Sequence, residues 1–451
     1  MQHSLIQTGY GLDDKPGHGV AALTGLQHLL AVFGGIVTAP FLIAAGMGLD
    51  GAEIEYFIAS ALVVSGMATL IQIARFGGIG SGLLSIQGTS FTFVGPLIFV
   101  YSQRASDTPF DVVLGQIFTA CLICALLMMV LARNLHRLQR IMTPSVAGTT
   151  VMLLGITLIW ASYNTLKYEV ATTGGIAWGL AAIALVTVLV FAFVGKPMLR
   201  LMSIALGLLV GLIAAVAVGA TALPSYAELP TLFVPQPLRY APALDVSIVV
   251  ALLPIFIVSA TESVGDLTAT ARLSGLPVEG RSFLSRLRGG ISADALNSAI
   301  AAILATFPNT TFSQNNGVIR LTGVASRRVG LYVGGFLIIA GALPAVAATL
   351  RVMPGSVVAG ATLLMFVMVA VSGWNIVSNA DQPRRAQLIV WPAIAVGLCI
   401  PLVLQKLPGL PSGITTVLGF PVSTGAFAAM ILELVIPRPT EPHSATQGLA
   451  Q

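Results

Sequence analysis

The stretch that decides the fold is Ser313–Gly323, S-Q-N-N-G-V-I-R-L-T-G, which sets one glutamine and two asparagines in a row inside an apolar part of the chain. A lipid bilayer offers no water to such amides, so each needs a partner in the protein or in a ligand. Polar groups at membrane depth are costly and usually functional. We interpret this segment as the floor of a binding site for a small solute.

Composition identifies an all-α polytopic membrane protein. The chain has 451 residues, of which 56% are hydrophobic and only 9% charged, with a mean hydropathy of +0.92. Soluble domains are roughly a quarter charged. The net charge of +5 is spread over many short loops, which excludes a nucleic-acid surface and instead reports topology. Residues 1–19 are polar, without a secretory signal, and are expected to form a solvated tail.

A membrane-spanning helix needs about 20 apolar residues. Fourteen candidates appear, divided seven and seven, and an odd number per half predicts two inverted repeats that meet in the Pro-rich loop 223–245. The candidate spans are 20–43, 54–74, 80–101, 112–132, 143–161, 176–195, 201–222, 246–269, 289–306, 311–325, 330–350, 355–378, 387–405 and 413–436.

The basic residues support this count. With both termini in the cytoplasm, the predicted inner segments hold 16 of the 22 Lys and Arg residues and the outer loops hold 5, with Arg320 inside the tenth span. That asymmetry is what the positive-inside rule expects. The inner set is Lys15, Arg75, Arg133, Arg137, Arg140, Lys196, Arg200, Arg272, Arg281, Arg286, Arg288, Arg327, Arg328, Arg384, Arg385 and Arg438.

The third and tenth spans are interrupted at matching places in the two halves. Residues 80–96 and 306–317 are both rich in Gly, Ser, Thr and Pro, and paired interruptions of this kind indicate a transporter's binding site. β-branched and aromatic residues there favour short extended pieces. Pairing of the two pieces as antiparallel strands would satisfy the backbone that a broken helix leaves open.

Acidic residues within spans are the first candidates for the site. Glu262 and Asp266 are four residues apart and share one helix face, away from lipid. Asp294 lies in a short polar span, where a functional role and helix capping both stay open. His28 follows Gln27 in the first span, where packing and proton relay are the alternatives.

The first interruption adds Gln87, Ser90 and Phe91. An aromatic ring is core filler by default, but at a helix break it can stack on a flat ligand. A carboxylate accepts two N–H bonds, and a primary amide offers a donor and an acceptor. Together these groups suit a planar heterocycle edged with N–H and C=O, such as a purine dione or a pyrimidine dione.

Enzyme chemistry finds no support in the sequence. Zinc-ligand spacing, a Ser-His-Asp set and a phosphate-binding loop are all missing, and no metal or cofactor is expected beyond a proton as coupling ion. Cys121 and Cys124 form a C-x-x-C pair without a nearby histidine. We interpret these two cysteines and Cys399 as small apolar core residues.

The chain resembles the nucleobase–ascorbate transporter family. The resemblance rests on Q-N-N-G-V-I-R-L-T-G, on the Gln-His pair of the first span, on Q-G-T-S-F in the third and on A-T-E-S-V-G-D in the eighth. It covers about residues 20–437. F-P-N-T-T-F-S-Q-N-N-G-V-I and L-T-G-V-A-S-R are similar to the branch of bacterial xanthine and uric acid permeases, whereas uracil permeases of the family carry Glu in place of Gln314.

The resemblance implies a division into a core and a gate domain, with homodimers formed through the gate. The core would comprise 20–135 (spans 1–4) and 245–352 (spans 8–11). The gate would comprise 136–225 (spans 5–7) and 353–437 (spans 12–14), and 438–451 would be a cytoplasmic tail. The protein would lie in the bacterial inner membrane.

The resemblance also implies roles for the site residues. Glu262 and Gln314 would hold the purine, Phe91 would stack on it, and backbone N–H groups near Ser90 and from Asn315 to Gly317 would add bonds. His28 would also belong to the substrate-binding residues. The group that organises the site and couples protons would comprise Asp294, Asp266, Glu262, Asn315, His28 and Gln87. The small hydroxyl of Ser90 leaves room for an extra oxo group, so xanthine and uric acid both stay open.

The resulting hypothesis is proton-coupled import of a purine dione by alternating access. Two alternatives stay open: a permease for uracil or another nucleobase, and an anion exchanger of the same architecture. An exchanger should place a cation at the helix breaks, and Arg320 is the sole candidate there. Arg320 occupies a free position of the signature, and snorkelling to the cytoplasmic side is the alternative.

Overall fold

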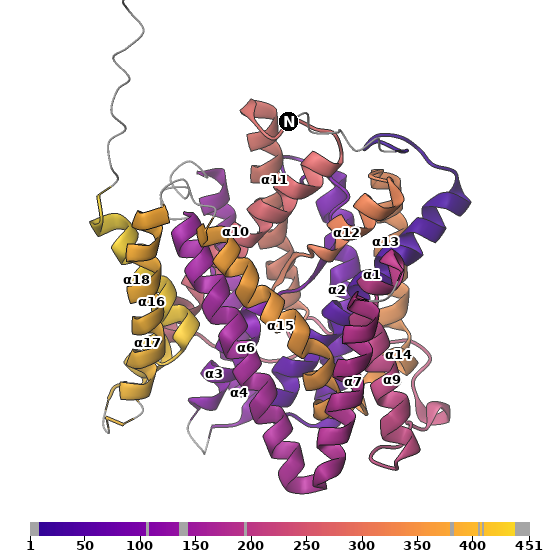
Figure 1. Cartoon of the computed structure of the whole chain (residues 1–451), viewed down its shortest axis with the longest axis horizontal. Helices are drawn as coiled ribbons and strands as arrows, with labels where there is room; N and C mark the ends of the chain where they lie inside the picture. Colours follow the sequence, from indigo (N-terminus) through magenta and orange to yellow (C-terminus); the bar gives the residue numbers. More distant parts are fainter. Residues whose placement is uncertain are drawn as a thin grey trace, which may run out of the picture.

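The computed structural model describes residues 9–104, 108–134, 143–193, 196–378, 383–404, 406–407 and 410–437. The predicted tail at 438–451 lies outside the described residues, as do Arg137, Arg140 and Arg438. The described chain is mostly helical (Figure 1).

The helices follow the apolar runs of the sequence. In the described ranges, eight helices are long and apolar enough to cross a membrane, or nine if α13 and α14, bent by 68°, form one span. The helices are α1 (His18–Gly46), α2 (Gly51–Ala74), α3 (Val94–Ser102), α4 (Phe110–Arg133), α6 (Pro144–Thr173), α7 (Gly175–Phe193), α8 (Pro197–Leu201), α9 (Ser203–Ala217), α10 (Val246–Leu273), α11 (Gly280–Ile303), α12 (Gln314–Thr322), α13 (Arg327–Ala342), α14 (Pro344–Arg351), α15 (Gly355–Ser378), α16 (Pro383–Leu404), α17 (Ser412–Leu418) and α18 (Pro421–Val435), with 3-10 turns η1 (Phe91–Phe93) and η2 (Tyr226–Glu228).

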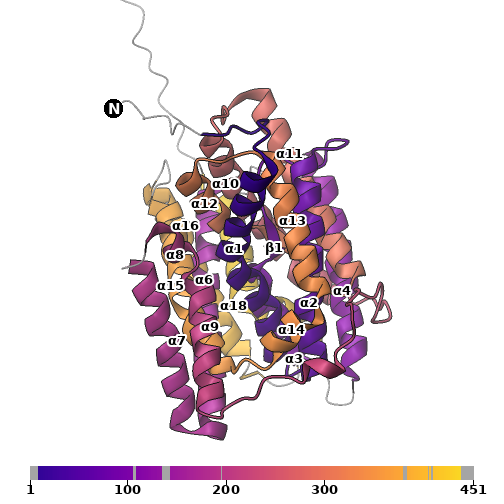
Figure 2. The ribbon, with the colours of Figure 1, turned by 90° about the vertical axis from the view of Figure 1, so that its right-hand side faces the viewer.

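The helices pack in two groups. In one group α2 contacts α13, α1 and α11, and α4 contacts α11 and α10. In the other group α15 contacts α6, α7 and α9, and α16 contacts α18 and α6. Figure 2 shows α7, α9 and α15 on one side of the molecule and α2, α13 and α4 on the other, with α1 between them.

A two-stranded antiparallel sheet lies at the interruptions, as predicted. β1 (Gln87–Thr89) pairs with β2 (Asn309–Thr311), with Gly88 opposite Thr310. The backbone of Phe312 donates to Ile86 O at 3.0 Å and extends the pairing. Two glycines make room for the Phe312 ring, because a Cβ on Gly35 or Gly88 would lie 2.6 Å from it. The residues that break both helices therefore build one shared structure.

Three expectations about segments are corrected. The sequence predicts a short ninth span at 289–306, but α11 has 24 residues and begins at Gly280, because Phe283 and Leu287, four residues apart, continue its buried face through R-S-F-L-S-R-L-R. The fifth was expected at 143–161, but α6 runs to Thr173. Residues 9–17 are no solvated tail: Leu12 is 6% exposed, and Tyr10 forms a parallel bridge with Val324.

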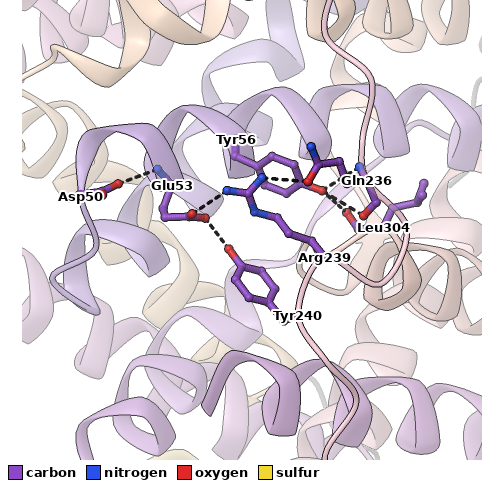
Figure 3. A network of polar contacts seen from close by, with 7 residues as sticks. All are labelled: Asp50, Glu53, Tyr56, Gln236, Arg239, Tyr240 and Leu304. Atoms are coloured by element: carbon purple, nitrogen blue, oxygen red, sulfur yellow. Dashed lines mark hydrogen bonds and ion pairs between the residues drawn. The ribbon is translucent and has the colours of Figure 1, made fainter. Parts of the chain in front are cut away.

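The Pro-rich loop between the halves is tied down by polar contacts (Figure 3). Arg239 Nη2 lies 2.7 Å from Glu53 Oε1 in α2, and the hydroxyl of Tyr240 donates to the other oxygen of Glu53. The guanidinium of Arg239 stacks over the Tyr56 ring, 4.2 Å from its centroid. Tyr56 Oη also donates at 3.2 Å to the carbonyl of Leu304, just after α11. Burial, together with the hydrogen bond to Glu53, raises the pKa of the Tyr240 phenol.

Candidate functional site

Both acidic residues of α10 are held by threonines of the interrupted segments. Thr92 Oγ1, in η1, donates to Glu262 Oε2 at 2.8 Å. Thr311 Oγ1, in β2, donates to Asp266 Oδ2 at 3.1 Å. Both carboxylates are half-buried. The predicted common face of Glu262 and Asp266 is therefore turned toward the sheet, and each carboxylate accepts from a different interrupted segment.

The amide-rich segment forms the first turn of α12 and is anchored on both sides. Gln314 is its first residue and is half-buried. Asn315 Nδ2 donates to Leu84 O at 2.6 Å, just before β1. Thr270 Oγ1 of α10 donates to Asn316 Oδ1 at 2.6 Å. The two asparagines thus fix the start of α12 between α10 and β1, while the Gln314 amide lies at a helix N-terminus, where the backbone dipole favours electron-rich atoms.

Asp294 lies in the interior of α11, so the capping alternative is wrong. It is buried, and Gln72 Nε2 of α2 donates to its Oδ1 at 3.3 Å. Gln72 also accepts from the backbone of Ser81 at 3.3 Å, which ties the start of the first interruption to α11. Gln72 is not among the predicted site residues, although a lone glutamine in an apolar helix is as costly to bury without a partner as the other polar residues.

A hydroxyl contact continues this polar layer. Ser263 Oγ in α10 and Thr310 Oγ1 in β2 are 3.1 Å apart. Ser263 and Gln87 both lie beside the Asp294 carboxyl group. The layer therefore runs from α2 through α11 to the sheet and to the turn of α10 that holds Glu262 and Asp266.

Several buried polar atoms of this layer have no well-formed hydrogen bond within the described chain. They include both ring nitrogens of His28, both amide atoms of Gln87, both amide atoms of Asn309 and Oδ2 of Asp294. Asn315 is the polar neighbour of the His28 ring. Buried polar groups without partners are rare in native proteins, and where they cluster they mark sites for water, protons or ligands.

The aromatic element is where the sequence predicted it. Phe91 opens η1, with one residue between it and β1, and is half-buried. Its ring packs edge-on against Phe366 of α15, with centroids 5.8 Å apart, and its centroid lies 6.4 Å from that of Phe312. Phe366 comes from the other helix group and was not foreseen, because no local pattern in α15 marks it. Phe91 therefore lies where the two groups meet.

Three other residues singled out in the sequence, Ser90, Gly317 and Arg320, make contacts elsewhere in the protein or face outward. The Ser90 side chain is buried, and its N–H donates to Pro308 O at 2.9 Å, so that N–H is engaged within the protein. Gly317 packs against α8, because a Cβ there would lie 2.6 Å from Leu201 Cδ2. Arg320 is exposed in the last turn of α12.

The cysteines divide between core and surface. Cys121 and Cys124 of α4 are fully buried, as predicted. Cys399 of α16 is exposed, so its placement in the core was wrong. An apolar run cannot distinguish a core face from a lipid face. Among the described residues, no group of three or more His, Cys, Asp or Glu side chains could hold a metal ion.

The chemistry available at this site is recognition through hydrogen bonds. Carboxylates, amides and hydroxyls converge where two helices break, beside an aromatic ring at the boundary of the helix groups. Such a set can bind a planar polar molecule and exchange protons with it.

Relatives with known names match almost the whole chain. The chain is 37% identical over 443 residues to xanthine permease XanP of Escherichia coli K12, covering 95% of this chain and 94% of that protein. It is 33% identical over 456 residues to xanthine permease XanQ of the same organism, covering 100% and 98%. It is 31% identical over 484 residues to the uric acid-xanthine permease of Emericella nidulans, covering 97% and 84%.

A solved structure supports the fold. The transmembrane domain of the cyanobacterial bicarbonate transporter BicA superposes with a TM-score of 0.53 at 14% identity, covering 94% of this chain and 99% of that one. The sequence model of a permease family matches residues 19–406. The chain therefore belongs to the xanthine/uracil permease family, a family of multi-pass membrane transporters and not of enzymes.

Proposed function

We propose that this protein imports a purine dione, xanthine or uric acid or both, by proton symport. The observation that carries the proposal is the carboxylate of Glu262, which a threonine of the first interruption holds at the break in the membrane helices. A carboxylate at this depth needs partners, and the adjacent N–H groups of a purine dione supply two. The names of the bacterial and fungal relatives support this substrate class.

In this proposal Glu262 and Gln314 form hydrogen bonds with one edge of the purine ring, and Phe91 stacks on its face. Ser90 limits the space at the opposite edge, and the backbone from Asn315 to Gly317 lies at the same helix end. Selectivity follows because a ligand without the matching donors and acceptors leaves buried groups unpaired.

Proton coupling belongs to the polar layer behind the ligand. Asp266, Asp294, His28 and Gln87 would organise that layer, with Glu262 at its ligand-facing end. A proton that neutralises one of these carboxylates lowers the cost of carrying the loaded site through an apolar barrier. Oδ2 of Asp294 and both ring nitrogens of His28 lack a well-formed hydrogen bond in the described chain, and buried polar atoms of this kind support a role in binding water or protons.

The architecture we propose is fourteen membrane segments in two inverted repeats of seven. The group of α1–α4 and α10–α14 would form the core domain, and the group of α6–α9 and α15–α18 the gate domain, supported by the packing of Figure 2. Substrate would cross as the core moves against the gate, with Phe91 and Phe366 at the boundary. A homodimer through the gate, in a bacterial inner membrane with both termini cytoplasmic, completes the proposal.

The test is uptake of radiolabelled xanthine, urate, uracil and guanine in a host that lacks nucleobase transport, with cross-competition. We expect saturable xanthine or urate uptake that stops when the proton gradient is collapsed. Uptake of uracil alone would show that the substrate is another nucleobase and not a purine dione. Uptake inhibited by bicarbonate or sulfate, and not by purines, would identify an anion exchanger, a function that the exposed position of Arg320 does not favour.

A further inference from the structure

A pocket with an apolar floor and a basic rim lies where α13 begins and α2 ends. Its volume is about 500 Å³. The floor is formed by Leu70 and Ile73 of α2 and Leu331 of α13. The size is within the range of pockets that hold small ligands, roughly 300–1,000 Å³.

The rim of this pocket is positively charged. Lys15, Arg327 and Arg328 line it, together with Asp13 and Asp14. Asp13 pairs with Arg327, and Asp14 Oδ2 accepts from the backbone N–H of Gly11 at 2.7 Å. Three cations and two anions therefore leave the rim with a net charge of +1, and Lys15 and Arg328 are the cations outside the Asp13–Arg327 pair.

Two further arginines reinforce this charge from outside the pocket. Burial and the positive charges of Arg75 and Arg327 lower the pKa of Arg286, and the Asp13 carboxylate opposes this shift, so three guanidinium groups and one carboxylate lie in one neighbourhood. Arg75 itself reaches Ser285 Oγ at 3.3 Å. Cations that repel one another in this way gain from a shared anion.

The pocket lies at the end of a helix that could cross a membrane, beside exposed apolar side chains. α2 is one of the helices long and apolar enough to cross a membrane, and the pocket lies at its last turns. Leu331 is 57% exposed and Phe76, two residues after α2, is 85% exposed. Figure 2 shows α2 and α13 side by side on the flank opposite α7 and α15. An apolar floor beside exposed apolar side chains, together with a charged rim, matches an amphipathic ligand with an anionic head.

We propose that this pocket binds an anionic phospholipid. Its phosphate would lie between Lys15 and Arg328, and an acyl chain would follow Leu70 and Leu331 toward the membrane interior. Basic pockets between membrane helices recognise such headgroups through charge and hydrogen bonds. The site is assembled by the N-terminal segment, so bound lipid should also hold that segment against α13.

The experiment measures lipid binding by the purified full chain in detergent, using native mass spectrometry and thermal unfolding with added phosphatidylglycerol or phosphatidylcholine. We expect tighter binding and larger thermal stabilisation with phosphatidylglycerol. The double variant Lys15→Gln/Arg328→Gln should lose about fivefold in apparent affinity per charge removed, or about 25-fold in all. Leu331→Trp, which fills the pocket at an exposed position, should weaken binding without a charge change.

The matched control is Lys196→Gln/Arg200→Gln, which removes two exposed basic residues at α8. This control should bind phosphatidylglycerol as the unmodified protein does. Equal binding of the two lipids, or equal losses in the two double variants, would overturn the proposal. Inorganic phosphate that binds as tightly and displaces the lipid would assign the pocket to a soluble anion and would overturn it too.

Discussion

Glu53→Ala should destabilise the protein far more than an ordinary surface ion pair would suggest. The Glu53 side chain is 11% exposed and accepts from both Arg239 and Tyr240, as Figure 3 shows. Leaving a buried partner of a charged hydrogen bond unsatisfied costs about 1.5–3 kcal/mol. Arg239 is 27% exposed and can form hydrogen bonds with water once Glu53 is removed. Its contribution to the cost therefore lies at the low end of that range. We therefore expect a loss of about 2–4 kcal/mol in the free energy of unfolding.

The matched control lies on the same helix, two residues further on. Glu55 pairs with Arg351 at 3.1 Å, with side chains 20% and 34% exposed. Both side chains of this pair keep more contact with water than Glu53 does, and solvated ion pairs contribute about 0.2–1 kcal/mol, so Glu55→Ala should cost about 1 kcal/mol. The assay is reversible unfolding of the purified protein in mixed micelles. If Glu53→Ala costs no more than Glu55→Ala, the loop is not held as described.

Three further variants probe the site and the sheet. Thr92→Val removes the hydrogen bond to Glu262 and should raise the KM for xanthine uptake about five- to tenfold, since such a bond is worth about 1–1.5 kcal/mol. Gln72→Leu leaves Asp294 without its donor and should change the pH dependence of uptake while xanthine binding persists. Gly88→Ala puts a Cβ 2.6 Å from a facing phenylalanine ring and should lower stability by about 1–3 kcal/mol, measured by thermal unfolding.

The controls for two of these variants make the same substitution at a position away from the site and the sheet. Thr157 donates only within its own helix, to Leu154 O at 2.9 Å, so Thr157→Val should leave the KM unchanged. Gly179 has no atom within 4 Å of an added Cβ, so Gly179→Ala should unfold at the normal temperature. A normal KM in Thr92→Val, a normal pH profile in Gln72→Leu, or equal stability of the two alanine variants would contradict the corresponding prediction.

The sequence predicts those parts of the fold that depend on residues close together in the chain. The paired strands were foreseen because Gly, Pro and β-branched residues interrupt two otherwise apolar spans, and a broken backbone in a membrane needs a partner. The shared face of Glu262 and Asp266 follows from helical spacing alone. Their threonine partners could not be foreseen, because hydroxyls are common in membrane helices and only the fold brings Thr92 and Thr311 to α10.

What the sequence did not predict depends on contacts between distant segments. The pairing of Tyr10 with Val324 joins residues more than 300 positions apart, and nothing in a short polar segment indicates such a partner. The Arg239 contacts with α2 are of the same kind. The predicted length of α11 is too short because hydropathy marks only the residues that are apolar enough to lie in a membrane. It does not show how far a helix continues into the polar segment beside them. Cys399 shows that hydropathy also cannot separate lipid-facing from buried residues.

The most direct test of the proposed site is binding of radiolabelled xanthine to purified Glu262→Gln and Gln314→Ala, compared with the unmodified protein. Two charge-assisted hydrogen bonds from Glu262 are worth about 3 kcal/mol or more, so the first variant should bind at least about a hundredfold more weakly. The second should lose binding as well, with both proteins folded. Unmodified affinity in either variant would show that the purine is held elsewhere.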